Sequence, residues 1–375
     1  MEVKKKVIGQ GPDGADIEIF QYILKGNHPG PIIHVQANIH GAELQGNQVI
    51  AQLIDYFSHH SFHGEIRFVP AANPIALRNK IGTSTQGRYN SITGENWNRS
   101  YQDFKNLPQE KSGFSIDEFA HRVQGYKKQE IITDFKKSLK ESLIHYRDYL
   151  ERSYSLKADK ALHLELQIMA ADADIVLDLH TGPIATDYIY AGIYQKEDAS
   201  HLGFPFTLLI PNQFAGAMDE ACFMPWRILD ESLKKRGKNF ELAINAYTVE
   251  LGSEEVISQE KGRIQTNRLL NYLNFKGMKL DLLNYPCLKT EQIYTKLENF
   301  YSLHAPYGGL FEYIKKPGDI FKKGEILGRY LFTHKPGDSF EVKAQGDGYI
   351  ISHCPSSAVY SGMTLFQLLS SPSLF

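Results

Sequence analysis

Cysteine is scarce in this sequence. Only Cys222, Cys287 and Cys354 occur among 375 residues, too few and too far apart for a disulfide framework or for a zinc site built from cysteines. A chain without a disulfide framework suits a reducing compartment, so we expect a cytoplasmic location.

Long hydrophobic runs and an excess of charge of one sign are also lacking. No stretch reaches about 18 apolar residues, and the N-terminal lysines are followed by Gly-Pro-Asp-Gly at 11–14 instead of an apolar segment. We therefore expect neither a membrane span nor a secretory signal. The 41 Lys and Arg residues nearly balance the 43 Asp and Glu residues, so no broad positive field is available to hold a nucleic acid or an acidic membrane surface.

The pattern along the chain predicts an α/β domain followed by a small all-β domain. Apolar, strand-like segments alternate with helical ones in the first part, which favours an α/β sheet. The expected strands are 31–39, 65–71, 175–180, 204–210 and 242–250. After about residue 294, glycine and proline turns recur at short intervals, which is typical of β-hairpins. We predict domains at 1–293 and 294–375.

A lysine-rich, mostly helical stretch at about 103–173 interrupts the α/β pattern and predicts an insertion. The expected helices are 116–122, 131–150 and 158–170. Their spacing favours an amphipathic hairpin that packs on the sheet. The alternative is a lid or a dimer surface near the active site.

Two apolar strands run into a histidine that is followed closely by glycine. The first reaches His40, with Glu43 three residues later, and the second reaches His180. A pair spaced as His40 and Glu43 also arises by chance, as an exposed histidine beside a glutamate in a helix's first turn. The position of His180 at the end of a second strand favours a metal site, because ligands gather at the carboxyl ends of strands in open α/β sheets. Two imidazoles and one carboxylate leave a fourth position open, as in catalytic zinc sites, so we predict one zinc ion per chain.

Asp178 precedes His180 by two residues and therefore shares its face of the strand. It is expected either to orient His180 or the substrate, or to be a buried salt-bridge partner.

Asn98 and Arg99 follow a glycine-containing loop. The planar guanidinium of arginine can bind a carboxylate through two parallel hydrogen bonds, and an adjacent amide adds another donor. We interpret the pair as a candidate anchor for a substrate carboxylate. Taken alone, such a dipeptide is more often part of a surface loop.

Glu250 closes a further apolar segment. A carboxylate within reach of a water activated by the metal can accept its proton and pass it to the leaving nitrogen. Glu250 is therefore the predicted general base, with an ionised partner of a lysine or arginine as the alternative. Glu254 and Glu255 are expected at the solvated start of a helix.

Four motifs in order resemble those of the succinylglutamate desuccinylase/aspartoacylase family, whose members are similar to zinc carboxypeptidases. The motifs are His40-Gly-Ala-Glu43, Asn98-Arg99, Asp178-Leu-His180 and Glu250-Leu-Gly. The resemblance covers most of the chain outside the insertion. It implies a carboxypeptidase-like mixed β-sheet flanked by helices.

The same resemblance implies roles for individual residues. Zinc ligands are expected at His40, Glu43 and His180, and the general base at Glu250. Asn98 and Arg99 are expected to bind a carboxylate, and Arg88 is the nearest candidate for a carbonyl-polarising arginine upstream of them. Two features depart from the family: Asn96 stands where an aspartate is usual, and the helical insertion is not typical of the small acylases.

The glycine-containing hairpins of 317–350 look like those of biotinyl or lipoyl carrier domains. A carrier lysine is commonly placed at a tight hairpin between two methionines, whereas Lys343 is expected at the start of a strand. We predict no biotin or lipoate here, and expect the domain to pack against the catalytic one and narrow its cleft.

We therefore predict a zinc-dependent amidohydrolase that cleaves an amide bond of an N-acyl amino acid or a similar small carboxylate-bearing substrate. The alternatives are a carboxypeptidase-like peptidase, in which Arg99 would hold a peptide's terminal carboxylate, an esterase, and a non-catalytic binding protein. The expected partner is a small molecule, neither a nucleic acid nor a membrane, and the sequence allows a homo-oligomer.

Overall fold

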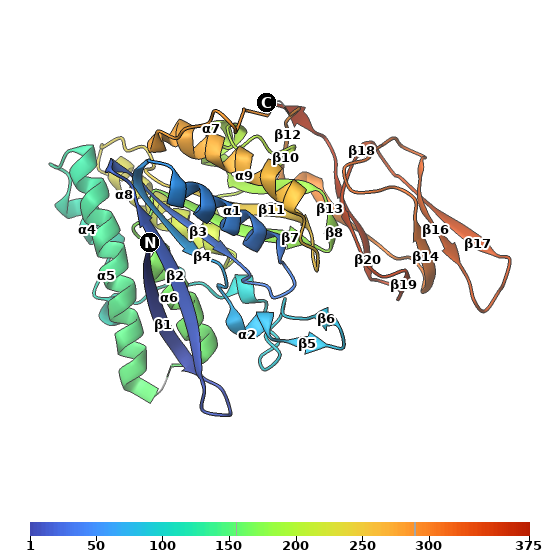
Figure 1. Cartoon of the computed structure of the whole chain (residues 1–375), viewed down its shortest axis with the longest axis horizontal. Coiled ribbons are helices and arrows are strands. Elements are labelled where there is room, and N and C mark those ends of the chain that lie inside the picture. Colours follow the sequence, from blue (N-terminus) through green and yellow to red (C-terminus); the bar gives the residue numbers. More distant parts are fainter. Residues whose placement is uncertain (155, 289) are drawn as a thin grey trace.

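A ten-stranded mixed sheet runs through the larger part of the computed structural model, which describes residues 1–154, 156–288 and 290–375 (Figure 1). The strands, in spatial order, are β1 (Glu2–Gln10), β2 (Asp16–Lys25), β4 (His63–Val69), β3 (His28–Ala37), β7 (Ile175–Gly182), β11 (Asn245–Ser253), β9 (Asp187–Gly192), β10 (Phe206–Ile210), β12 (Ile293–Lys296) and β21 (Ser373–Leu374). This large sheet confirms the predicted α/β class.

The centre of the sheet is parallel. β3 pairs in parallel with β4 and with β7, and β7 pairs in parallel with β11. Every residue of β7 is buried, as expected for a parallel strand that is covered on both faces. The carboxyl ends of β3, β7 and β11 therefore meet at one edge of the sheet.

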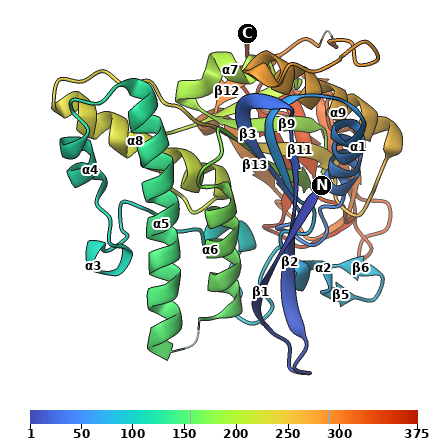
Figure 2. The ribbon, with the colours of Figure 1, turned by 60° about the vertical axis from the view of Figure 1, so that its left-hand side comes forward.

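Helices cover both faces of the sheet (Figure 2). They are α1 (Gln45–His59) and α9 (Gln259–Leu273) on one face, and α6 (Ala158–Ala170) and α8 (Met218–Lys235) on the other. Successive residues of a strand point to opposite faces. Accordingly, Leu177 belongs to the hydrophobic cluster under α1 and α9, and Val176 to the cluster under α6 and α8.

The lysine-rich stretch is helical and packs on the α8 side of the sheet. Besides α6 it contains α3 (Gln109–Ser112), α4 (Ile116–Arg122) and α5 (Lys128–Tyr154). Phe135 of α5 meets Trp226 of α8 with 4.8 Å between the ring centroids. Figure 2 shows α5 beside α6. These helices extend the hydrophobic core, and α5 is longer than the helix predicted at 131–150.

Two smaller antiparallel sheets follow at one end of the molecule (Figure 1). One contains β13 (Phe300–His304), β20 (Thr364–Leu369), β18 (Gly348–His353) and β15 (Ile320–Phe321), and the other β17 (Ser339–Lys343), β16 (Ile326–Leu331), β14 (Gly309–Tyr313) and β19 (Ala358–Val359). They confirm the predicted all-β part. Lys343 ends a strand instead of starting one.

The large sheet and the C-terminal sheets are joined by strand pairing. The short strand β8 (Ile184–Ala185), which follows β7, pairs with β18. β12 and β21 both belong to the large sheet. The boundary proposed between residues 293 and 294 therefore falls within β12, and the division into two domains remains a proposal.

Several local predictions differ from the structure. β3 ends at Ala37 and α1 begins at Gln45, so the intervening residues form a turn longer than expected. The helix start predicted at Glu254 and Glu255 is wrong, because both lie in a turn and α9 begins only at Gln259. The β1–β2 hairpin and β9 were not predicted. Within the described ranges, no helix has the length and apolar character needed to cross a membrane.

Candidate metal centre

The turn between β3 and α1 presents His40 and Glu43. It begins with Asn38, which adopts a left-handed conformation at φ 62° and whose side-chain amide donates to the backbone oxygen of Glu43 at 2.7 Å. A Cβ on Gly41 would lie 2.2 Å from the carbonyl oxygen of Ala76, so a larger residue would displace the turn. The sequence thus fixes both functional side chains through local backbone contacts.

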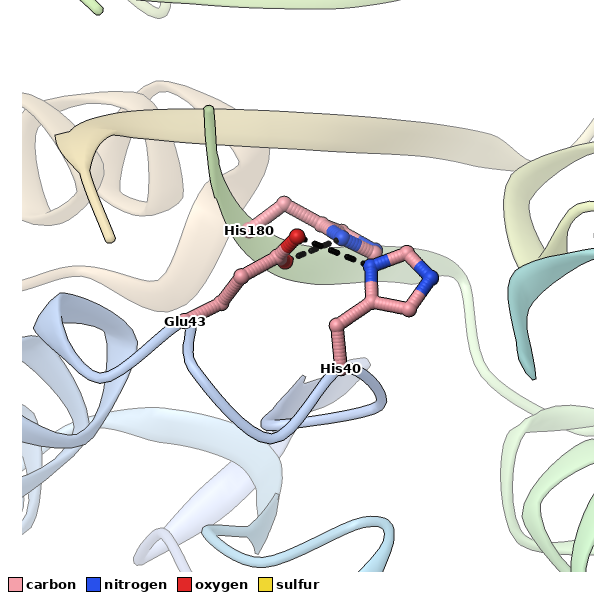
Figure 3. A group of neighbouring side chains, drawn as sticks. All are labelled: His40, Glu43 and His180. Carbon is pink, nitrogen blue, oxygen red and sulfur yellow. Dashed lines mark hydrogen bonds and ion pairs between the residues drawn. The ribbon is translucent and has the colours of Figure 1, made fainter. Parts of the chain in front are cut away.

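His40, Glu43 and His180 converge in the structure (Figure 3). One potential ligand atom from each residue lies within 4.8 Å of the others. Nδ1 of His40 is 2.8 Å from Oε1 of Glu43, and Nδ1 of His180 is 2.7 Å from Oε2. All three side chains are buried. Two distant parts of the chain therefore offer nitrogen and oxygen ligands to one point, as the sequence predicted.

The outer nitrogen of each imidazole faces an oxygen acceptor. Nε2 of His180 lies 2.8 Å from Oδ2 of Asp178, and Nε2 of His40 lies 2.9 Å from Oδ1 of Asn96. A proton on each Nε2 can donate to these oxygens, which leaves both Nδ1 lone pairs facing the carboxylate of Glu43. Metal-binding histidines are usually held in this way. Of the roles considered for Asp178, the geometry favours orienting His180.

The charges around the cluster favour a cation. Burial alone would raise the pKa of Glu43, but His40 and His180 hold this pKa well below its usual range. Burial opposes protonation of His180, but Asp178 and Glu43 raise the pKa of the imidazole well above its ordinary value. The donor set and its charge therefore fit a divalent metal ion.

Glu250 lies directly across from His180 as its register partner in the β7–β11 pairing. Its Oε2 is buried and has no hydrogen-bond partner within the described part of the chain. Burial raises the pKa of Glu250 to about 8, with His180 opposing this shift and Glu43 adding to it. In its ionised form, this carboxyl group can accept a proton at the unused oxygen beside the cluster.

A pocket of about 230 Å³ brings all of the predicted site residues together: His40, Glu43, Arg88, Asn98, Arg99, His180 and Glu250 line it. Nη1 of Arg88 is 3.5 Å from Oε1 of Glu43, and the Arg88 side chain is 47% exposed. Nδ2 of Asn98 lies 3.3 Å from Nε2 of His180. Arg99 forms no ion pair with any residue that the structure describes, so its charge is available to a ligand.

A second pocket, of about 350 Å³, adjoins the first. Arg88, Tyr190 and Glu250 line both pockets. The far wall of the second pocket includes His353 of β18 and Gln367 of β20. The C-terminal sheet that contains β18 and β20 thus borders the cleft, in agreement with the expected position of this part of the chain.

Some pocket residues were missed by sequence reasoning. Tyr190, Asp219 and Phe300 line the first pocket but belong to none of the four motifs. Asp219 follows a loop between β10 and α8 that has no distinctive spacing. Acidic residues near a helix start are common, so its sequence position carried no signal for a site.

An α/β sheet whose parallel strands bring two histidines, a glutamate and a second buried glutamate to one edge defines a class of hydrolase with a candidate metal centre. Residues 29–275 match the family model described as the succinylglutamate desuccinylase/aspartoacylase catalytic domain. The chain belongs to this family, which consists of deacylases.

Solved structures of the family are similar to the chain over its whole length. A family protein from Shewanella amazonensis SB2B is 33% identical, with 100% of both chains covered and a TM-score of 0.92. One from Shewanella frigidimarina NCIMB 400 is 31% identical, with 100% of this chain and 98% of that chain covered and a TM-score of 0.92. The product-bound ectoine utilization protein EutE (DoeB) from Ruegeria pomeroyi is 18% identical, with 98% and 95% coverage and a TM-score of 0.65, a likeness of fold. No curated protein matches the sequence.

Proposed function

We propose that the chain is a zinc-dependent deacylase that hydrolyses the amide bond of an N-acyl amino acid or a similar small carboxylate-bearing substrate. The observation that carries the proposal is the placement of Glu250 directly across from His180, beside the cluster of His180, His40 and Glu43. A proton acceptor and a candidate metal site thus share one pocket. Family membership supports the reaction type.

Zinc is the metal that the donor set fits best. Two imidazoles and one carboxylate are a common ligand set of catalytic zinc, and the Nδ1 atoms of His40 and His180 both face Glu43. A bound zinc ion would polarise the substrate carbonyl and make a water molecule more acidic. The outer hydrogen bonds to Asn96 and Asp178 keep the two rings oriented for this task.

The protein's own residues then move the proton and stabilise the developing charge. Glu250 accepts the proton of the attacking water at its free Oε2 and donates it to the leaving nitrogen as the amide bond breaks. The guanidinium of Arg88 lies beside Glu43 at the mouth of the pocket. From there it can donate to the carbonyl oxygen as negative charge develops on it.

Arg99 and Asn98 are proposed to hold the substrate carboxylate. Arg99 has no acidic partner in the described structure, and a guanidinium binds a carboxylate through charge-assisted hydrogen bonds. The C-terminal strands border the cleft, which favours a small substrate over an extended peptide. A carboxypeptidase-like enzyme would use the same residues. Only the preferred substrate distinguishes a deacylase from such a peptidase.

The test combines metal analysis with a substrate panel. Elemental analysis of the purified protein should find about one zinc per chain. The zinc-loaded protein should hydrolyse N-acyl amino acids faster than short peptides and the corresponding esters. Preferred cleavage of peptides would favour the carboxypeptidase-like alternative, and absence of both metal binding and turnover would contradict the proposal.

A further inference from the structure

Asp219 is a buried acid in the same pocket as Arg99. It is the second residue of α8, its exposed fraction is 2%, and it lines the pocket of about 230 Å³. Oδ1 accepts a hydrogen bond from the backbone N–H of Glu220 at 2.9 Å. Among the residues that the structure describes, none donates to Oδ2 of Asp219 and no lysine or arginine pairs with it. One carboxylate oxygen therefore remains available.

The carboxylates of the neighbouring acids Glu220 and Asp178, by contrast, already have hydrogen-bond partners. Oε2 of Glu220 accepts hydrogen bonds from the backbone N–H groups of Ala215 and Ala217 at 2.6 and 3.2 Å, which closes the start of α8. Asp178 accepts from Gln36 and faces His180. The free oxygen of Asp219 is thus not explained by helix capping or by the candidate metal centre.

The electrostatic surroundings of Asp219 lack a compensating cation. The pKa of Asp219 is raised to about 7, chiefly by burial and also by the charges of Glu220 and Asp178, while the hydrogen bond from the backbone of Glu220 and the charge of His180 oppose this shift. Burying a carboxylate without a counter-charge is costly. A ligand with a positive charge would supply that counter-charge.

Arg99 and Asp219 are held at a fixed separation because their chain segments are bound to each other. Oδ1 of Asn98 accepts from the backbone N–H of Met218 at 3.2 Å, and the backbone N–H of Tyr101 donates to the oxygen of Gly216 at 3.3 Å. A Cβ on Gly216 would lie 2.4 Å from the carbonyl oxygen of Arg99, so the two backbones touch. A cationic and an anionic side chain are thereby presented together to a ligand.

We propose that Asp219 binds an ammonium group of the substrate, so that the preferred substrate is an N-acyl amino acid with a second, unacylated amino group. Arg99 binds the carboxylate of this substrate, and Asp219 binds its free ammonium. The inference rests on the proposed function and specifies the amine half of that substrate. Ornithine is a test amino acid of this class.

The experiment compares substrates that differ only in this charge. N-acetylornithine and N-acetylnorvaline share the same side-chain carbons, and N-acetylglutamate carries a negative charge instead; a succinyl series repeats the comparison. The zinc-loaded wild type should show a kcat/KM about 10–100-fold higher for the ornithine derivative, the range expected for a hydrogen bond to a charged group. Equal or lower values for the ornithine derivative would overturn the inference.

Two variants assign the preference to Asp219. Asp219→Asn should remove the preference, so that the ratio of kcat/KM for the ornithine and norvaline derivatives falls to about one. Glu231→Gln removes a negative charge from an exposed position of the same helix and should leave the preference unchanged. A folded Asp219→Asn protein that still prefers the ornithine derivative would also overturn the inference.

A binding measurement separates this inference from the proposed function. Calorimetry with free ornithine, norvaline and glutamate tests the pocket without any reaction. Tighter binding of ornithine than of norvaline by the wild type supports the inference even if no N-acyl amino acid is hydrolysed, an outcome that would defeat only the proposed reaction. Indistinguishable or weaker binding of ornithine defeats the inference, whatever the turnover.

Discussion

Nε2 of His40 lies 2.9 Å from the side-chain oxygen of Asn96, whereas Nε2 of His180 lies 2.8 Å from the carboxylate of Asp178. The two imidazoles are therefore oriented by acceptors of different charge. In the family, an aspartate is usual at the position that Asn96 occupies in this chain. In the structure this departure lies beside His40, and Asn96 is not among the residues that line the pocket of about 230 Å³.

We predict that Asn96→Ala lowers zinc affinity by about 10–100-fold, because His40 loses the acceptor that orients its ring. Asn96→Asp should bind zinc more tightly than the wild type, since a carboxylate makes the imidazole a stronger ligand. Competition with a chromophoric chelator measures both affinities. Asn284→Ala, at an exposed position, is the control, and an affinity of Asn96→Ala equal to that of this control would contradict the prediction.

Glu250→Gln should keep the zinc and lose the activity. Glutamine preserves the size of the side chain but cannot carry the proton, so kcat should fall by about 10²–10⁴. Among the described residues, Glu250 forms no ion pair, although the charge of Arg88 acts on it. We therefore expect Glu250 to serve as a base and not as a charged partner at a strand end. The melting temperature should therefore not fall.

Zinc content, melting temperature and kcat of Glu250→Gln are measured on one preparation. Glu254→Gln is a suitable comparison, because Glu254 is also an acid with a raised pKa, of about 7, caused by burial and by Glu43, but it lines neither pocket. Near-normal turnover of the zinc-loaded Glu250→Gln protein would exclude Glu250 as the general base.

Arg99→Ala should raise KM by about tenfold or more, the loss expected when a charged hydrogen bond to the substrate carboxylate is removed. A smaller fall in kcat would follow if the substrate is then misaligned. Arg99→Lys should recover part of the binding, because the charge remains but the planar fork is lost. Steady-state kinetics measure these effects, and Arg152→Ala, which removes an exposed arginine on α5, is the control. An unchanged KM in Arg99→Ala would show that Arg99 has only a structural role.

The candidate ligands were predictable because they stand at strand ends. The apolar segments before His40 and His180 mark their strands, and the carboxyl ends of parallel strands collect functional residues. The pairing of Glu250 with His180 was not predictable in the same way. It depends on β11 lying next to β7, a contact across about 70 residues of chain that no local period encodes.

The errors have equally local causes. The acidic pair at 254–255 resembled a helix start. The chain turns there instead, and Glu255 adopts φ 60°, an uncommon conformation for a residue other than glycine. Asp219 comes from a segment without a motif. The position of the C-terminal domain at the cleft was expected, but the residues of β18 and β20 that line the second pocket were not. Such residues become visible only when tertiary packing brings them to the pocket.

The last prediction concerns an ion-pair cluster that joins the helical stretch to the sheet. Oδ1 of Asp172 lies 2.6 Å from Nη1 of Arg67 on β4 and 3.0 Å from Nζ of Lys140 on α5. Burial alone would raise the pKa of Asp172, but Arg67 and Lys140 lower it to about 2. Because the folded-state pKa lies below that of the unfolded chain, about 3.9, the ionised carboxylate stabilises the fold at neutral pH.

Asp172→Asn should therefore lower the free energy of unfolding by about 2–3 kcal/mol at pH 7, the linkage value of this shift. For the wild type the contribution is present above about pH 4 and is lost as the pH falls through about 2, so the difference between the two proteins should shrink between pH 5 and pH 3. Urea unfolding at these pH values measures it. Asp55→Asn, whose side chain is 77% exposed, controls for the loss of one charge. A difference that does not depend on pH would show that Asp172 stabilises the fold through packing and not through its charge.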